Sequence, residues 1–222
     1  REDFCGTTNT SCEWIQRRKT NTAISVDLDD EVLEWGRQNK VAKLTPDQAK
    51  RITIINDNVL TVKTKPVDII LAMNFSYWIF KERASLLRYF RSARTALAPD
   101  GLFLIDVYGG SDAYVTMNES RKVNGFTYVW EQADYDPITG HAECHIHFKF
   151  KDGSRLRRAF SYRWRLWSLP EIRELLEEAG FSNITVLWQG TDEETGEGNG
   201  EFLPVERGEA DPAWIAYVQA EP

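Results

Sequence analysis

Short apolar runs alternate with helical segments through the first half of the chain, and this alternation constrains the fold more than any other feature. The runs are rich in β-branched and aliphatic residues and lie at 22–28, 51–57, 67–73 and 102–108. The segments with helical spacing of apolar residues lie at 9–18, 29–39 and 82–98. Apolar strands that alternate with helices indicate a parallel sheet covered on both faces. We therefore predict an α/β fold with a doubly wound, mostly parallel sheet.

The pattern changes after about residue 120. Segments 126–135, 141–151 and 155–164 alternate with period two, and turn signals separate them at Pro137–Gly140 and Asp152–Gly153. This predicts an antiparallel β-meander. One of its faces carries Phe126, Tyr128, Trp130, Cys144, Ile146, Phe148, Phe150, Phe160, Tyr162 and Trp164. So aromatic a face requires burial, either against the main domain or against another subunit.

The last third of the chain returns to the first pattern. Residues 168–181 read as a helix in which Ser168 is suited to the N-cap and Gly180 to the position after the last turn. Two strands follow at 182–190 and 213–220, and we predict a loop between them at 191–212 because that stretch is rich in Glu and Gly. We thus divide the chain into a core, 1–120 and 166–222, and a β insertion, 121–165.

Composition excludes several classes of protein. The chain has 222 residues, of which 42% are hydrophobic, enough for one globular unit with a sizeable core. Its net charge of −7 argues against a duplex nucleic-acid partner, because phosphate binding needs clustered Lys and Arg. The three cysteines show no disulfide or metal-binding pattern, which favours reduced thiols and a cytoplasmic location. No apolar run approaches the ~18 residues that a membrane span needs, so we expect no membrane partner.

The ends of the predicted strands carry a series of candidate ligand-binding residues. In a doubly wound sheet, ligands bind at the carboxyl ends of the strands. Cys5, Gly6 and Thr7 precede a helix whose first N–H groups can bind a carboxylate or phosphate. Asp27 follows Gly6 by 21 residues, close to the roughly 20-residue spacing at which an acid accepts ribose hydroxyls. The other candidates at strand ends are Asp57, Asn58, Met73, Asn74, Asp106 and Tyr108.

Several of these stretches resemble motifs of the class I S-adenosylmethionine-dependent methyltransferases. EDFCGTT (2–8), AISVDLDDEVLEWG (23–36) and IINDN (54–58) are similar to the first three motifs, and 67–78 and 97–108 to those of the fourth and fifth strands. The resemblance implies a Rossmann-like, seven-stranded sheet and S-adenosyl-L-methionine as cofactor. In this family a central strand precedes the first motif, so the resemblance also implies that the first strand lies upstream of Arg1.

The resemblance assigns roles to individual residues. Glu2 matches the acid of the first motif and Gly6 its central glycine, whereas Phe4 and Thr8 stand in place of the outer glycines. Asp27 would hold the ribose, Leu28 would pack on adenine and Asp57 would meet the adenine amino group. The predicted cofactor-binding residues are Glu2, Phe4, Cys5, Gly6, Thr7, Asp27, Leu28, Asp57, Asn58, Met73 and Asn74.

The stretch NFSY (74–77) occupies the place at which amino-group methyltransferases carry Asn/Asp-Pro-Pro-aromatic. Asn74 and Tyr77 match that motif, while Phe75 and Ser76 replace both prolines. The stretch therefore predicts either an amine-binding loop or a loop that only lines the cofactor pocket. The predicted acceptor contacts are Tyr77, Trp78, Tyr108 and Arg163, with burial in the core as the alternative for the aromatic residues.

The resemblance implies methyl transfer to a small-molecule acceptor, which would attack the sulfonium methyl in line through N, O, S or C. Such an enzyme mainly positions and desolvates its substrates, so no single catalytic residue is assigned. The meander resembles an insertion of small-substrate N-methyltransferases, and we expect it to roof the acceptor pocket in a monomer or homodimer. The alternatives are a protein or RNA acceptor, and a non-catalytic binding protein that kept the fold.

All three histidines lie in HAECHIH, where His141, Glu143, His145 and His147 share one strand face. Such spacing suits a metal site, but it also suits the solvent face of an amphipathic strand that continues into Lys149 and Lys151. We expect the second arrangement, and no metal.

Overall fold

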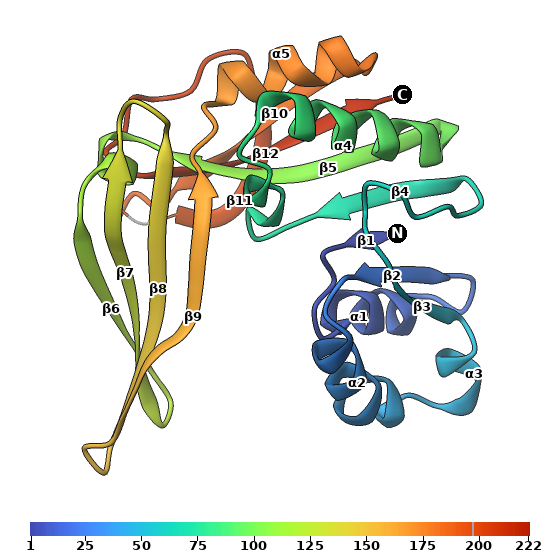
Figure 1. Ribbon diagram of the computed structural model, residues 1–222, viewed down its shortest axis with the longest axis horizontal. Helices are drawn as coiled ribbons and strands as arrows, with labels where there is room; N and C mark the ends of the chain where they lie inside the picture. The colour runs from blue at the N-terminus through green and yellow to red at the C-terminus, as the bar shows by residue number, and fades with distance from the viewer. Residues whose placement is uncertain (197) are drawn as a thin grey trace.

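The computed structural model describes residues 1–196 and 198–222, which form a mixed sheet of eight strands and a separate antiparallel sheet of four (Figure 1). The large sheet has the order β11-β10-β12-β5-β4-β1-β2-β3. Its strands are β1 (Glu2–Asp3), β2 (Ala23–Asp27), β3 (Ile52–Asn56), β4 (Val67–Ala72), β5 (Leu97–Gly109), β10 (Ser182–Thr191), β11 (Gly198–Val205) and β12 (Trp214–Glu221). Strands β1 to β5 are parallel, which confirms the predicted doubly wound α/β fold.

Helices cover both sides of this sheet, with α4 and α5 above it and α1 and α2 below it in Figure 1. The α-helices are α1 (Asn9–Arg17), α2 (Asp30–Asn39), α3 (Pro46–Ala49), α4 (Arg83–Ala96) and α5 (Leu169–Ala179). Three short 3-10 helices are η1 (Val41–Lys43), η2 (Ser76–Ile79) and η3 (Ser111–Tyr114). None of the helices in the described ranges is both long and apolar enough to cross a membrane.

The sheet has one strand more than predicted, because β11 lies within the segment 191–212 that we expected to be a loop. β11 pairs antiparallel with β10, with Val186 opposite Val205. An edge strand that is exposed to solvent needs little apolar sequence. The composition of this segment therefore did not indicate a strand, and β11 is defined only by its pairing with β10.

The start of the chain occupies the central position of the sheet. Glu2 pairs with Ser25 of β2 on one side and with Leu71 of β4 on the other. The first strand predicted to lie upstream is thus represented within the chain by two residues, Glu2 and Asp3. A cavity of about 610 Å³ lies beside Glu2 and is lined by residues of α1, β2, β4 and β5. Strand β1 places the loop that follows it at the carboxyl edge of the sheet.

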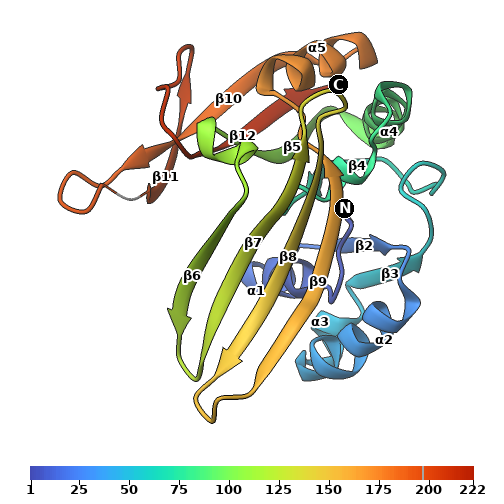
Figure 2. The ribbon, with the colours of Figure 1, turned by 60° about the vertical axis from the view of Figure 1, so that its left-hand side comes forward.

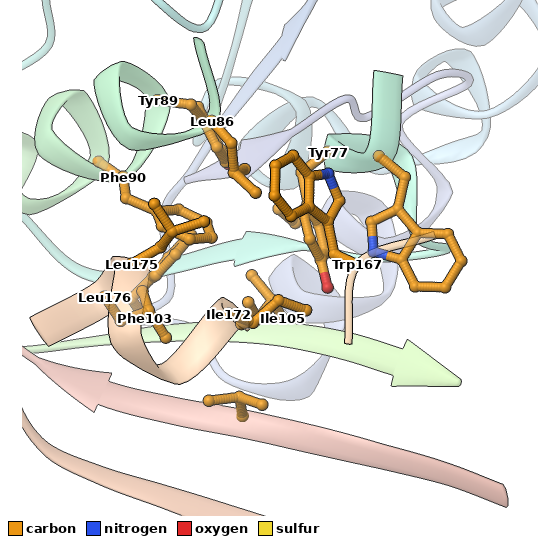
Figure 3. Close-up of a cluster of buried hydrophobic side chains, with 14 of the residues drawn as sticks. Tyr77, Leu86, Tyr89, Phe90, Phe103, Ile105, Trp167, Ile172, Leu175 and Leu176 are labelled. Atoms are coloured by element: carbon orange, nitrogen blue, oxygen red, sulfur yellow. The ribbon is translucent and has the colours of Figure 1, made fainter. Parts of the chain in front are cut away.

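The main core lies between the sheet and helices α4 and α5. Figure 3 shows side chains of both helices meeting those of β5; the fully buried members include Leu86, Tyr89, Phe90, Phe103, Ile105, Ile172, Leu175 and Leu176. Each such side chain contributes about 1.5–3 kcal/mol to folding. Helix α5 begins with a capping box between Ser168 and Glu171 and ends at Gly180 in the left-handed conformation, as its sequence predicted.

The small sheet contains the predicted meander, β7 (Phe126–Asp136), β8 (His141–Phe150) and β9 (Arg155–Arg165), and a fourth strand that was not predicted, β6 (Met117–Val123), which pairs with β7. It begins at Met117, slightly before the predicted boundary at 121. In Figure 1 the meander lies beyond the carboxyl ends of β2 and β4. In Figure 2 it crosses in front of α1 and β2. Its base is part of the main core, where Trp164 is buried.

Candidate functional site

The loop between β1 and α1 keeps a glycine-like backbone although two expected glycines are absent. Phe4, Gly6 and Thr8 all have left-handed φ angles, of 57°, 51° and 60°. A non-glycine residue pays about 1–2 kcal/mol for this conformation. The loop therefore retains at Phe4 and Thr8 the backbone geometry that glycines in those places would favour, at a cost that the surrounding fold offsets.

Asp27 at the end of β2 binds this loop directly. One carboxylate oxygen accepts the N–H of Gly6 at 2.7 Å, and the other accepts the N–H of Asp29 at 3.0 Å. A carboxylate has about four acceptor sites, so Asp27 can still accept hydroxyl donors. The Asn56 amide, which sequence analysis did not single out, donates to the backbone carbonyls of Asp27 and Leu28. The Leu28 side chain is 69% exposed.

Glu2 and Gly36 support the loop from its two sides. The Glu2 carboxylate accepts the N–H of Ser11 at 3.0 Å and its hydroxyl at 2.6 Å, so it caps the start of α1. Burial raises the pKa of Glu2. On the other side, a Cβ at Gly36 would lie 2.7 Å from the Thr7 carbonyl oxygen, so only glycine lets α2 approach this closely. An isolated glycine within a predicted helix was the available signal.

Cys5, the loop's thiol, is buried and packs against Gly6, whose carbonyl oxygen lies 3.8 Å from the sulfur. Burial raises the pKa of the Cys5 thiol well above its ordinary range, so the thiol is neutral.

The predicted adenine-side residues lie next to Asp27. The N–H of Asp57 donates to the Asp27 carbonyl at 3.1 Å, which joins the ends of β2 and β3. Asp57 accepts the N–H of Asn58 at 2.7 Å, and Asn58 accepts the N–H of Leu60 at 2.9 Å, so both side chains also shape the turn. The structure thus brings together Gly6, Asp27 and Asp57 from three strand ends, as the sequence predicted.

Asp106 fixes the loop after β4. Its two carboxylate oxygens accept the N–H groups of Asn74 at 2.7 Å and Phe75 at 2.9 Å, and both residues have left-handed φ angles, of 59° and 56°. Asp106 is only 7% exposed, and burial raises its pKa to about 6. The Tyr77 hydroxyl donates to the Asp106 carbonyl at 2.8 Å. The sequence predicts Asp106 at a strand end but assigns it no role; the available signal is an acid within the apolar run LFLIDVY.

The structure corrects three of the four predicted acceptor contacts. Tyr77 and Trp78 are completely buried in the core, so neither presents a surface to an acceptor. Arg163 lies on the opposite face of the meander from Trp164, beside Glu143 at 3.8 Å, because neighbouring residues of a strand point to opposite faces. In the loop before Tyr77, Asn74 is exposed, and Met73, Phe75 and Ser76 are half-buried.

Tyr108 remains at the candidate acceptor site. Its ring packs against Phe75 and Trp78, with centroid distances of 4.8 and 4.7 Å. Its hydroxyl is buried and has no hydrogen-bond partner among the described residues. Burial raises the pKa of Tyr108 well above its ordinary range, so the phenol is neutral and able to donate. Trp164 of the meander lies 6.4 Å from Phe75 and 5.9 Å from Trp78, which brings β9 against the same loop.

The histidines of the meander have protein partners. His145 is 1% exposed and forms a hydrogen bond with Ser161 at 2.8 Å, so the expectation of a solvent-exposed face is wrong for this residue. His147 contacts Glu131 at 2.8 Å through Nε2 and accepts the N–H of Arg158 through Nδ1. The residues that the structure describes contain no group of three or more His, Cys, Asp or Glu side chains arranged to hold a metal ion.

Comparison with solved structures identifies the fold. The methyltransferase CcbJ from Streptomyces caelestis superposes with a TM-score of 0.72 at 15% identity, over 100% of this chain and 82% of that one. The chain has the fold of the S-adenosylmethionine-dependent methyltransferases. A methyltransferase of that class from Clostridium acetobutylicum gives a TM-score of 0.68 at 16% identity, over 100% and 83% of the two chains.

The glycopeptide N-methyltransferase MtfA, solved with S-adenosyl-L-homocysteine, gives a TM-score of 0.62 at 16% identity, over 99% of this chain and 79% of that one. These alignments span the methyltransferase fold and the meander alike. No family model and no curated protein matches the sequence.

Proposed function

We propose that the protein transfers a methyl group from S-adenosyl-L-methionine to a small-molecule acceptor. The observation that carries this proposal is the loop of residues 4–8, whose left-handed backbone is tied to Asp27 at the carboxyl edge of a methyltransferase fold. Among the neighbours are an amino pentose methyltransferase, CalS10, and the sugar N-methyltransferase KedS8. They support a small molecule as acceptor and favour an amine.

The residues at the strand ends fit the cofactor. Asp27 retains acceptor capacity for the two ribose hydroxyls, and exposed Leu28 beside it offers an apolar surface for adenine. Asp57 lies next to Asp27 and would accept from the adenine amino group. The backbone around Gly6 would hold the methionine end, because an added Cβ there would meet only Val32, at 3.9 Å, and the loop surface is open. When bound, the cofactor supplies a methyl group that its sulfonium charge has already activated.

The chain's own part in the reaction is to orient the acceptor and to exclude water. Asn74 presents its exposed amide next to the cofactor edge, on a backbone that Asp106 holds in place. An amide oxygen there would accept a hydrogen bond from an amine and direct its lone pair. The aromatic rings of Phe75, Tyr108 and Trp164 shield the site from one side, which removes water that would compete for the nucleophile.

Calorimetry with S-adenosylmethionine and S-adenosylhomocysteine tests the first step. We expect both ligands to bind the wild type, and Asp27→Ala to lose roughly 1.5–3 kcal/mol of binding free energy, as hydrogen bonds to a charged group are worth. Asp30→Ala is the matched control, since Asp30 is an exposed acid three residues further along. Equal affinity in a folded Asp27→Ala protein would contradict the assignment of Asp27.

Methyl transfer itself is tested by following S-adenosylhomocysteine formation with a panel of amines, alcohols, thiols and carbon acids. Transfer to any of them distinguishes an enzyme from a binding protein of the same fold. Tight cofactor binding with transfer to a protein or RNA instead would move the proposal to a macromolecular acceptor.

A further inference from the structure

The outer half of the meander carries an apolar patch that no part of the described chain covers. We define the distal patch as Val123, Phe126, Phe148, Phe150, Leu156 and Phe160. Strand register places all of them on one face: Val123 is opposite Phe126, Phe126 is opposite Phe150, and Phe148 is opposite Leu156. The exposed fractions of Val123, Phe150, Leu156 and Phe160 are 43%, 42%, 51% and 54%. Soluble proteins rarely leave a contiguous patch of this kind uncovered without a function.

The distal patch continues the face that packs against the candidate acceptor loop. Trp130 is opposite Ile146, which is opposite Phe160, so the patch joins directly to the inner aromatic residues. On that inner part, Trp164 lies within 6.4 Å of Phe75, ring to ring. One apolar surface therefore extends from the loop at Asn74 to the outer end of the meander without a change of face.

The orientation of the distal patch indicates which ligand it binds. Trp164 packs against η2 from one side of the meander. That side faces the carboxyl ends of β2 and β4, and Figures 1 and 2 show the meander next to these ends. The reverse face is polar and carries Glu143, His145, His147 and Arg163. Within β7, β8 and β9 the patch side carries no charged side chain from Trp130 outward to Phe126, and charge on that side comes from Glu119 and Arg121 of the edge strand β6.

We infer that the distal patch binds the non-reacting part of the methyl acceptor, and that this part is an extended apolar or aromatic group. This inference rests on the proposed function. Phe160 is opposite Ile146 of β8, so the patch extends over the four residue steps from Ile146 to Phe150, which corresponds to roughly 13 Å at the rise of a strand. A group longer than one aromatic ring is needed to cover it. Binding energy from such a remote group helps to orient the reacting atom.

The test uses the dye 8-anilinonaphthalene-1-sulfonate and two amines that share one reacting group, benzylamine and 4-phenylbenzylamine. The double variant Leu156→Ser/Phe160→Ser removes two exposed apolar side chains, so the fold should persist. Leu203→Ser on β11 is the matched control, since Leu203 is 64% exposed and lies in the large sheet, outside the meander. Dye affinity is measured by fluorescence titration and S-adenosylhomocysteine affinity by calorimetry.

We expect the double variant to bind the dye about tenfold more weakly, the control to match the wild type, and both to keep the cofactor affinity. 4-Phenylbenzylamine should displace the dye from the wild type at concentrations about tenfold lower than benzylamine, and this advantage should vanish in the double variant. Equal dye affinity in double variant and wild type, or equal displacement by the two amines, would overturn the inference.

Sedimentation velocity separates the acceptor from a second copy of the chain. A wild-type dimer that the double variant dissociates would assign the patch to subunit contact and overturn the inference. A wild type that binds the dye at the patch but does not bind S-adenosylhomocysteine would instead refute the proposed function, so the two failures are distinguishable.

Discussion

Asp106 gives the clearest prediction, because it is a buried acid whose charge is used to hold a strained loop. Two backbone N–H groups donate to its carboxylate, yet burial outweighs them and raises the pKa from 3.8 to about 6. The folded state therefore binds the proton more tightly than the unfolded state. The stabilisation due to this proton is complete below the unfolded pKa and is lost as pH rises through about 6.

The size of the effect follows from the two pKa values. A shift from 3.8 to about 6 corresponds to roughly 3 kcal/mol in total, of which about 2 kcal/mol is lost between about pH 4 and pH 7. Asp106→Asn places a neutral amide at the site, so this pH dependence should disappear. At pH 7 the variant should be about as stable as the wild type, because the lost hydrogen bond and the removed buried charge act in opposite directions.

Urea unfolding at several pH values across this range measures the effect, and the difference between variant and wild type cancels the other titrating groups. We expect the wild type to lose about 2 kcal/mol more than the variant between about pH 4 and pH 7. Methyl transfer by the variant should fall, since the loop at Asn74 and Phe75 loses one of its acceptors. Parallel stability curves for the two proteins would refute the reasoning about Asp106.

Four further substitutions test the cofactor loop and the packing around the site. Gly6→Val should fold, but a β-branched residue at a φ of 51° should abolish cofactor binding in calorimetry; normal binding would show that the loop assignment is wrong. Gly36→Ala should lower the free energy of unfolding in urea by about 1–3 kcal/mol, because its Cβ would meet the Thr7 carbonyl, and no loss would mean that α2 can shift. Trp164→Ala should lower the free energy of unfolding by about 3–5 kcal/mol. Phe160→Ala should lower it by less than about 1.5 kcal/mol, because the Phe160 side chain is half exposed. Equal losses would contradict the burial of the meander's base.

The sequence by itself determined the local elements and the order in which they follow. Period and capping are short-range signals, so the parallel strands, the period-two meander and helix α5 with Ser168 and Gly180 could all be predicted. The spacing of Gly6 and Asp27 also predicted that two strand ends meet, since parallel strands place their carboxyl ends on one edge.

Only the tertiary structure decided which residues that are distant in sequence contact one another. Asp106 binds the backbone of Asn74 and Phe75 across about 30 residues of chain, and no local pattern encodes such a pairing. The glycine-like angles of Phe4 and Thr8 oppose their own preference and persist because the surrounding fold fixes them. β11 exists because β10 offers it an edge, and burial places Tyr77 and Trp78 in the core, away from any acceptor. At Phe4 and Thr8 long-range contacts outweigh a local preference of about 1–2 kcal/mol, which sequence patterns alone cannot reveal.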